Sequence, residues 1–346
     1  MTDARPQQPP RHDAPDGTLA ATITARATGA RIDRILAEVA GAPSRSRIKS
    51  LIVDGHLSVD GATVSDPAIR VKEGQHVELV LPTAAAEKPE SEARALDIVH
   101  EDADLIVVNK PADLVVHPAA GTPDGTLVNA LIRHCGDTLI GTGPEHRGGV
   151  VHRLDKDTTG LLVIAKSEAA EAGLIEQFKA REIERRYIGL VWGCPNPTHG
   201  TLAGPIGRSP RHRKKMDVIA EGGRPAVTHY DVREALCNAA AAVVEFKLET
   251  GRTHQIRVHV THAGHPLLGD PLYGGGGGRT RRRLSPDART AAQSFPRQAL
   301  HARTLGFQHP TQGDYMTFAA PLPQDMADLL TALGGDLAKH DPSGHI

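Results

Sequence analysis

The sequence predicts an α+β protein in which a small unit of two helices and a short sheet precedes a larger domain with a mixed, mainly antiparallel β-sheet. Three observations carry this prediction. Apolar residues at helical spacing gather near the N-terminus, a polar stretch rich in Ala and Pro interrupts the chain, and the β-rich runs beyond it lack a regular alternation with helices. Strands mixed with occasional helices favour α+β over a doubly wound sheet.

The first folded unit is expected over residues 18–83. Residues 1–17 are mostly Pro, Gln, Asp and Arg, so they have little to bury and are expected to be disordered. Helical spacing is found over 31–39 and again over 44–52, where Ser44 is a good N-cap residue. Two short strands are predicted at 56–59 and 77–81, with a turn at Asp60-Gly61 between them.

A linker is expected over residues 84–95 because this stretch is polar, Ala-rich and contains Pro. The larger domain is then predicted over 96–330, followed by a polar tail over 331–346. Strand-like runs in the domain are found at 105–109, 160–165, 186–191 and 242–248, and a helix is predicted at about 167–179.

Composition excludes several classes of protein. The three cysteines are widely separated and form no CxxC pair, which argues against a disulfide framework and a zinc site. No apolar run approaches the roughly 18 residues of a membrane span. The formal net charge of −1 gives no global sign of nucleic-acid binding, although such binding requires only a local basic surface. We therefore expect a cytoplasmic protein without a membrane partner.

The densest polar cluster beside a predicted strand runs from His152 to Gly160, and Asp155 is its central carboxylate. Viewed alone, the cluster is more often a turn, since Asp, Thr and Gly are turn formers. A metal site that uses His152 and Asp155 lacks a clustered third ligand, so no metal is expected. The turn therefore stays open as the interpretation of this cluster beside a role in chemistry.

The second cluster, residues 249–259, is interpreted as a turn that enters a helix, with Thr253 or Thr250 as the cap. Arg252, His254 and Arg257 lie within one or two turns of that start. They are either a solvated basic face or an anion site that also supplies a cation to keep a buried carboxylate ionised.

A tyrosine and several basic patches point to a nucleic acid. Tyr187 begins an apolar strand, where such a residue usually packs in the core but could also stack on a base. The loop 208–215 and the segment 279–283 after a glycine run are almost free of acids in a chain that is otherwise balanced. This segregation fits a polyanion, and RNA is the predicted partner. The candidate RNA-binding residues outside the two polar clusters are Arg31, Arg34, Arg45, Arg47, Lys49, Arg211, Arg213, Lys214 and Lys215.

Taken together, these motifs resemble the RluA-type pseudouridine synthases. The segment 152–160 is similar to that family's central motif, with Thr159 where the family has Ser, and 252–259 is similar to a later one. The stretches 109–119, 265–274 and 300–303 add to the likeness, which spans about residues 96–325. Residues 18–83 resemble an S4 RNA-binding domain. This order of domains is that of the subgroup acting on large-subunit ribosomal RNA.

The resemblance implies an enzyme that isomerises uridine to pseudouridine in RNA without a cofactor. It makes Asp155 the catalytic aspartate, Tyr187 the pocket tyrosine that stacks on the base, and Arg257 the partner of the aspartate. It makes Arg153 a candidate to fill the space of a flipped nucleotide. The substrate it implies is 23S ribosomal RNA in a stem-loop, free or in a pre-50S particle, and we expect the enzyme to be a monomer. The alternatives are the same reaction on tRNA or another RNA, and a non-catalytic ribosome-assembly factor.

Overall fold

The chain forms two compact units, residues 1–85 and 86–346. The computed structural model describes the residues 18–39, 45–81, 95–117, 124–136, 139–140, 148–212, 214–274, 278 and 280–340, apart from the side chains of Ser46 and Arg47. The expected disordered segment 1–17 and nearly all of the expected linker lie outside these residues, as does the end of the tail from 341.

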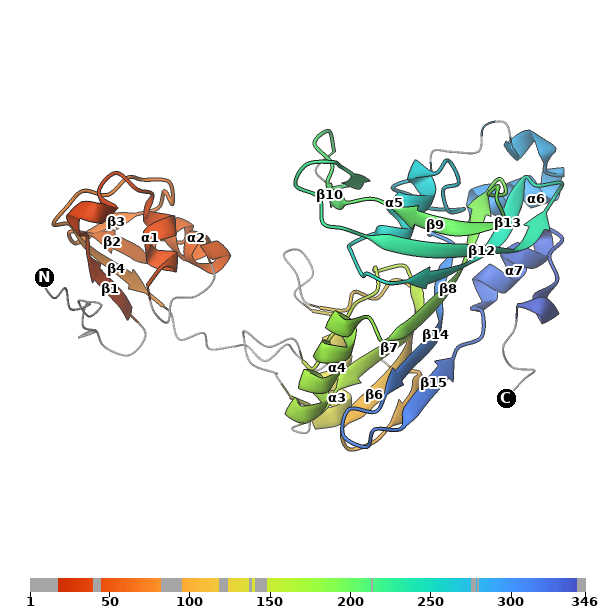
Figure 1. Ribbon diagram of the computed structural model, residues 1–346, viewed down its shortest axis with the longest axis horizontal. Helices are drawn as coiled ribbons and strands as arrows, with labels where there is room; N and C mark the ends of the chain where they lie inside the picture. Colours follow the sequence, from red (N-terminus) through yellow and green to blue (C-terminus); the bar gives the residue numbers. More distant parts are fainter. Residues whose placement is uncertain are drawn as a thin grey trace, which may run out of the picture. The chain divides into compact units, whose positions relative to one another are not determined.

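The N-terminal unit combines two helices with a four-stranded antiparallel sheet in the order β1-β4-β2-β3 (Figure 1). Its core contains apolar residues from the helices and from all strands except β3, and Ile32, Ile48 and Leu79 are fully buried within it. The bounds are β1 (Thr18–Thr22), η1 (Ala25–Ala27), α1 (Ile32–Ala37), α2 (Arg45–Val53), β2 (Leu57–Val59), β3 (Ala62–Val64) and β4 (His76–Val80).

Both helices and both strands predicted for this unit are present, but the turn connects a different pair. Asp60 and Gly61 have φ of 51° and 79°, the left-handed values of a two-residue hairpin turn, and they join β2 to β3. The expected direct passage from 56–59 to 77–81 was therefore wrong. Strand β3 has an exposed, partly polar edge, so it lacks the apolar alternation that marks a strand in sequence.

The larger unit is built on one nine-stranded sheet in which β5-β6-β7-β14-β8-β13-β12-β9 follow one another and β15 pairs with β14. Only the β7–β14 pair is parallel, so the predicted mixed, mainly antiparallel sheet is confirmed. The bounds are β5 (Ile98–Glu101), β6 (Leu105–Lys110), β7 (Thr159–Ala165), β8 (Glu184–Trp192), β9 (His199–Ala203), β12 (Val227–Leu236), β13 (Ala241–Leu248), β14 (Leu300–Gln308) and β15 (Tyr315–Ala319). A separate hairpin pairs β10 (Ile206–Arg208) with β11 (Met216–Val218).

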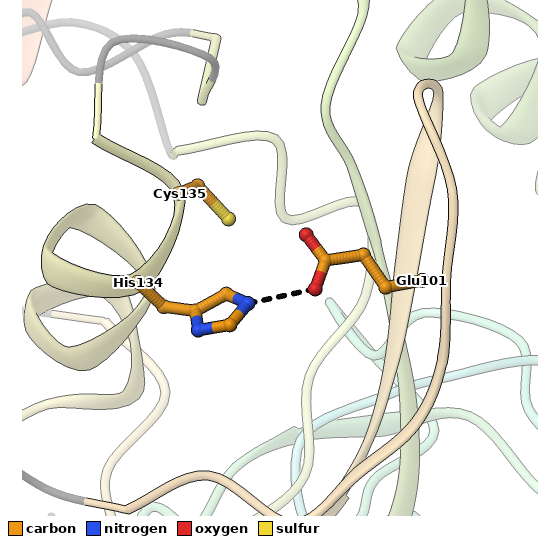
Figure 2. Close-up of side chains that lie close together, drawn as sticks. All are labelled: Glu101, His134 and Cys135. Atoms are coloured by element: carbon orange, nitrogen blue, oxygen red, sulfur yellow. Dashed lines mark hydrogen bonds and ion pairs between the residues drawn. The ribbon is translucent and has the colours of Figure 1, made fainter.

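Helices flank this sheet at several places. Figure 1 shows α3 and α4 beside β6 and β7, and α6 and α7 beside the half of the sheet that contains β13. The bounds are α3 (Leu127–Cys135), α4 (Glu168–Ala180), α5 (Gln255–His262), η3 (Thr280–Arg283), α6 (Pro286–Ser294), α7 (Gln324–Ala332) and η4 (Leu337–Lys339). The end of α3 is tied to β5 because His134 Nε2 lies 2.7 Å from a carboxylate oxygen of Glu101 (Figure 2).

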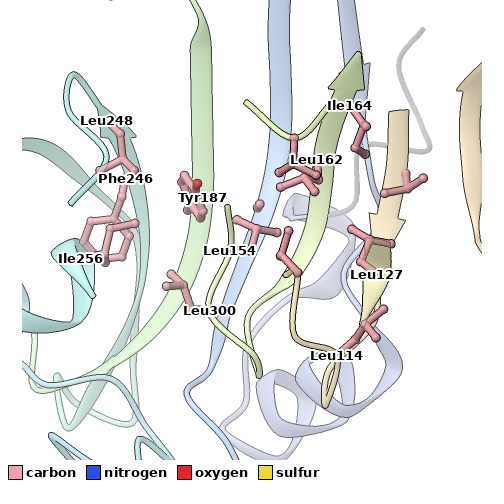
Figure 3. Close-up of a cluster of buried hydrophobic side chains, with 14 of the residues drawn as sticks. Leu114, Leu127, Leu154, Leu162, Ile164, Tyr187, Phe246, Leu248, Ile256 and Leu300 are labelled. Carbon is pink, nitrogen blue, oxygen red and sulfur yellow. The ribbon is translucent and has the colours of Figure 1, made fainter. Parts of the chain in front are cut away.

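Side chains of β8 alternate between the two faces of the sheet, and both faces are covered by apolar clusters. Ile188, Leu190 and Trp192 join a core cluster with residues of α6 and α7. Tyr187 and Val191 point the other way, into a cluster that includes Leu154, Ile256 and Leu300 (Figure 3). The second cluster brings the central polar motif, β8 and α5 together, and this is the face that carries the site.

The folded unit continues beyond residue 330. Helix α7 runs to Ala332, Leu333 is buried, and His340 is 3% exposed with its Nε2 2.9 Å from Glu234. The polar appearance of 331–340 in sequence conceals this packing, because one apolar side chain and one buried hydrogen bond fix the segment.

Candidate active site

A cavity of about 700 Å³ opens on the face of the sheet that holds Tyr187, within the roughly 300–1,000 Å³ range of ligand pockets. It is lined by the loop 151–158, the end of α4, the start of β8 and the segment 248–257. Leu154, Tyr187, Leu248, Ile256 and Leu300 belong both to this lining and to the hydrophobic core, so the rigid core forms part of the cavity wall.

Asp155 lies in this cavity and is held by Arg257 of α5. Arg257 Nη1 donates to Asp155 Oδ2 at 3.0 Å, while Nε and Nη2 donate to the two oxygens of Asp270 at 2.7 and 2.9 Å. Burial opposes the charge of Arg257, but the hydrogen bonds and charge of Asp270, and then those of Asp155, hold its pKa above the usual value. One guanidinium therefore fixes a fully buried carboxylate on one side and a partly accessible one on the other.

Asp270 is the anchor of this arrangement. Its burial disfavours ionisation, yet the Arg257 pair and the amides of Leu272 and Tyr273, which donate to Oδ1 at 2.9 and 3.0 Å, hold its pKa below the usual value. Asp270 was not proposed as a site residue. The only sequence signal was its place in the stretch 265–274, which contributed to the family resemblance.

The start of α5 differs from the expected one. The N-cap is His254, with φ of 57° in the left-handed region, and neither Thr250 nor Thr253 caps the helix. Instead, Gln255 Oε1 accepts from the amide of Arg252 at 3.0 Å and from the hydroxyl of Thr250 at 2.8 Å. The prediction of a Thr cap was wrong because the side chain of a residue inside the helix reaches back to the turn.

His254 is held at the site by a tyrosine from elsewhere in the chain. Its Nδ1 lies 2.9 Å from the hydroxyl of Tyr273, and its Nε2 lies 4.0 Å from Asp155 Oδ1. Burial lowers the pKa of His254, and the charge of Asp155 opposes that shift. The ring of Tyr273 is contacted by two cations, Arg257 at 5.1 Å and Lys215 at 5.7 Å from the ring centroid. Tyr273 was also not proposed from the sequence.

Tyr187 lies on the cavity wall with 6% of its surface exposed. Burial raises the pKa of its hydroxyl, and the charge of Asp155 acts in the same direction. The ring packs in the core, as such a residue usually does, and it also lines the cavity, while its stacking on a base stays a prediction.

The loop that carries Asp155 is braced by buried side chains. The ammonium of Lys110, 1% exposed, donates to the carbonyls of Pro111, Leu114 and Lys156 at 2.8–2.9 Å. Arg297 Nη1 donates to the carbonyl of Asp157 at 3.1 Å, and its other nitrogens bind Asp325. Gln298 donates to the hydroxyl of Thr158. These contacts give the loop that carries Asp155 a fixed backbone next to the cavity.

The other predicted RNA-binding residues of the large unit fall into two places. Arg153 and Arg252 line the cavity, and Arg252 Nε donates to the carbonyl of Pro225. Arg211, Lys214 and Lys215 lie in the loop between β10 and β11, where Arg211 and Lys214 are exposed. This loop reaches the site through Tyr273, whose hydroxyl accepts from the amide of Met216 at 2.8 Å. Arg213 lies outside the described residues.

In the N-terminal unit, three of the predicted cations converge on one buried carboxylate. Arg31, Arg45 and Lys49 lie 3.0, 3.1 and 3.6 Å from Asp33, whose side chain is fully buried. The hydrogen bond from Arg31 is the largest influence that lowers the pKa of Asp33, to about 2. The three cations keep 43–49% of their side chains exposed, so they can still reach a ligand. Arg34 pairs with Glu38, and the side chain of Arg47 is not among those described.

Among the described residues one group of side chains could share a metal ion, and the pair considered from the sequence, His152 and Asp155, does not belong to it. His152 Nε2 accepts from the amide of Val163 at 3.1 Å, and burial lowers the pKa of this ring to about 3. Glu101, His134 and Cys135 lie close enough to share an ion (Figure 2), but Lys166 already donates to Glu101 at 2.7 Å. An ion there would have to displace the ammonium and the imidazole from the carboxylate, so we assign it no metal.

These features match a known family. The RNA pseudouridylate synthase family matches residues 104–262, which contain Asp155, Tyr187 and Arg257, and the S4 domain matches residues 30–77. With the relatives below, the chain belongs to the RNA pseudouridylate synthases and carries an N-terminal S4 domain. The predicted family, fold class and enzyme class are thereby confirmed, and the S4 domain supports the predicted binding of RNA.

Among the relatives, the chain is 47% identical to ribosomal large subunit pseudouridine synthase D of Zymomonas mobilis over 316 residues, covering 90% of this chain and 96% of that protein. It is 43% identical to the protein of the same name from Escherichia coli K12, covering 93% and 96%. Among solved structures, human RNA pseudouridylate synthase domain containing 4 aligns with a TM-score of 0.52 at 26% identity, covering 68% of this chain and 92% of that one. No helix in the described parts of the chain is long and apolar enough to cross a membrane.

Proposed function

We propose that this enzyme converts specific uridines of large-subunit ribosomal RNA to pseudouridine, with Asp155 as the catalytic residue. The substrate is inferred from two relatives that carry the name ribosomal large subunit pseudouridine synthase D and align over nearly the whole chain. The observation that carries the catalytic role is the ion pair of Asp155 with Arg257 inside the cavity, 3.0 Å between the nearest atoms.

The reaction is an isomerisation, so its atoms balance without a donor or an acceptor of electrons. The bond between C1′ and N1 breaks, the uracil turns, a bond forms between C1′ and C5, C5 loses a proton and N1 gains one. Attack at C1′, addition at C6 and deprotonation at C2′ all begin with a carboxylate that is ionised. Arg257 Nη1 donates to Asp155 Oδ2 at 3.0 Å, and this bond orients the carboxylate within the cavity.

The cavity explains how a single base can be isolated for this chemistry. A base must leave its stack, which costs a few kcal/mol, and contact with an aromatic face can return ~1–3 kcal/mol of that. We assign this contact to Tyr187, and we assign to Arg153, exposed at the cavity rim, the role of filling the vacated space. His254 and Arg252 would contact the bound nucleotide from the opposite wall.

The remaining cations are assigned to the RNA around the target stem-loop. These are Arg31, Arg34, Arg45, Arg47 and Lys49 of the S4 domain and Arg211, Arg213, Lys214 and Lys215 of the loop between β10 and β11. We further propose that the enzyme acts as a monomer in the cytoplasm, on free large-subunit RNA or a pre-50S particle, and that it uses neither a cofactor nor a metal.

The test is base-by-base mapping of pseudouridines in the ribosomal and transfer RNA of a strain that lacks this enzyme. We expect one or a few positions of large-subunit RNA to lose the modification, and wild-type chain but not D155N to restore it. The control is D157N, because the backbone carbonyl of Asp157, and not its carboxylate, accepts from Arg297, so this variant should retain most activity.

Three results would contradict parts of the proposal. Restoration by D155N would remove the catalytic role of Asp155. Loss of pseudouridine only in tRNA would replace the substrate. A strain whose growth or ribosome assembly is restored by D155N without modification would show a binding role that is independent of catalysis.

A further inference from the structure

Arg185 is a buried cation in the cavity that the reaction described above does not use. It stands two residues before Tyr187 on β8, so strand alternation places both side chains on the same face. Arg185 is 7% exposed and lines the cavity. Burial lowers the pKa of its guanidinium. Within the described part of the chain its Nε has no hydrogen-bond partner, and its Nη2 makes one long bond, 3.4 Å to the carbonyl of Glu249.

Other cations already pair with the carboxylates that line the cavity. Asp155 is bound by Arg257, and Glu249 accepts from His229 at 2.6 Å and from Arg181 at 3.0 Å. Among the lining residues there are seven lysines and arginines but only these two acids. A buried charge without a counterion is unfavourable, and such a group persists where a ligand supplies the missing charge.

The surroundings hold the guanidinium of Arg185 in place rather than neutralise it. Its central carbon lies 5.3 Å from the ring centroid of Phe178, whose ring is packed against His152 at 4.8 Å. Gly251 leaves space on the other side, because a Cβ at that position would lie 3.0 Å from Nη1 of Arg185. Stacking on an aromatic face and close approach to the backbone fix the orientation of an arginine but do not neutralise its charge.

We propose that Arg185 binds a backbone phosphodiester of the RNA strand next to the target uridine. Its Cα lies about 7 Å from that of Tyr187 along the strand, so a nucleotide whose base contacts Tyr187 would bring a flanking phosphate to this end of the cavity. Arg257 cannot fill this role because its nitrogens are occupied by Asp155 and Asp270. Arg185 is thus a positioning residue that sets where the strand enters.

The experiment replaces phosphates of a stem-loop substrate one at a time by neutral methylphosphonates and measures binding and turnover. With wild-type enzyme we expect one linkage beside the target uridine whose replacement weakens binding about 10-fold or more, since charge-assisted bonds to phosphate are strong. R185M should bind the unmodified RNA equally weakly, show no further loss at that linkage, and have a slope of log K against log salt that is less steep by about 0.7.

The matched control is R186M. Arg186 carries the same charge one residue further on, but it points to the other face, where it binds Glu184 and Glu245 at 2.6 and 3.0 Å. R186M should keep the wild-type sensitivity to the methylphosphonate. R185Q provides a second variant if R185M does not fold.

Thermal melting of the free protein, measured without RNA, separates this role from a purely structural one. Because the charge of Arg185 is uncompensated in the free protein, R185M should melt at the same temperature as wild type or higher. A lower melting temperature with unchanged RNA binding, or an equal methylphosphonate effect in wild type and R185M, would overturn the proposal. The inference rests on the proposed function for the choice of RNA and for the contact of the target base with Tyr187. If the large-subunit stem-loop is not modified, the proposed substrate fails, and the same scan is made on the RNA that mapping identifies.

Discussion

Arg257 is the residue on which the site depends, because it holds two carboxylates with different tasks. Asp270 is fully buried and accepts two parallel bonds from Arg257, which fixes the plane of the guanidinium. The remaining nitrogen is then aimed at Asp155, which is 16% exposed and faces the cavity. Asp155, the proposed catalytic residue, is thus oriented by a partner that is itself held in place.

Replacing Arg257 by Lys tests this view. A lysine keeps the charge but cannot bind both carboxylates, so we expect kcat to fall about 100-fold or more while RNA affinity changes little. Single-turnover assays and binding assays on the same stem-loop separate the two effects. The control is R233K, since Arg233 pairs with Asp231 and Glu245 away from the cavity. A loss of binding equal to the loss of turnover would mean that Arg257 contacts the RNA instead.

At the residue scale, sequence reasoning proposed the side chains that line the cavity but not the residues that hold them. Asp155, Tyr187, Arg257, His254, Arg153 and Arg252 were proposed from the sequence, and the structure places all six around one cavity. Asp270, Tyr273 and Arg185 were not proposed. Asp270 and Tyr273 hold other residues of the cavity through contacts between separate segments, such as that of Arg257 with Asp270, 13 positions apart, and no local pattern encodes such a contact. The catalytic roles themselves stay predictions.

At the scale of the elements, the loop 155–159 is held in place by side chains from several other segments. It lies between the core residue Leu154 and β7, and the side chains that hold it come from β6 and from the segment before β14. Gly160 is needed at the start of β7, because with φ of 112° a Cβ there would lie 2.2 Å from the carbonyl oxygen of Ala302. The one parallel pair of the sheet passes through this point.

Lys110 offers a test of the loop, because its ammonium binds three carbonyls in a site from which water is excluded. Replacing it by Met keeps the apolar stem but leaves the carbonyls unsatisfied, at a cost of about 1–3 kcal/mol for each strongly buried group. We expect K110M to melt several degrees lower and to lose turnover by more than 10-fold. The measurements are thermal unfolding and pseudouridine formation under saturating RNA.

The comparison for K110M is K247M, on an exposed position of β13. It should leave both quantities near wild type. If K110M unfolds earlier but keeps full turnover at a temperature where it is folded, Lys110 stabilises the domain without positioning Asp155.

The elements themselves were predicted where periodicity is strong. The runs at 105–109, 160–165, 186–191 and 242–248 all lie in strands, and the helix near 167–179 is α4. Strands β1 and β3 were missed because their sequences are short and weakly apolar. The direction and order of the strands did not follow from sequence periodicity, because pairing such as β7 with β14 joins residues about 140 positions apart.

At the scale of the whole molecule, each unit has a core of its own. Within residues 18–39 and 45–81, apolar side chains pack around Ile32, Ile48 and Leu79, and the larger unit packs around its nine-stranded sheet. The complete cavity, with Asp155 and Arg257, is built from residues of the larger unit. The residues proposed for the chemistry lie in the larger unit and the S4 domain lies in the N-terminal unit, so we expect the two functions to be separable.

Deleting residues 1–83 tests this separation. The shortened chain should unfold cooperatively and keep kcat within a few-fold, because all lining residues of the cavity remain. Its affinity for a large-subunit RNA fragment should fall about 10-fold or more with a less steep salt dependence, because the exposed S4 cations would no longer release counterions from the RNA.

A full-length variant with Gln at Arg34, Arg45 and Lys49 distinguishes loss of charge from loss of chain, and it should reproduce most of the change in salt dependence. Unchanged affinity of the shortened chain would mean that the larger unit alone recognises the RNA.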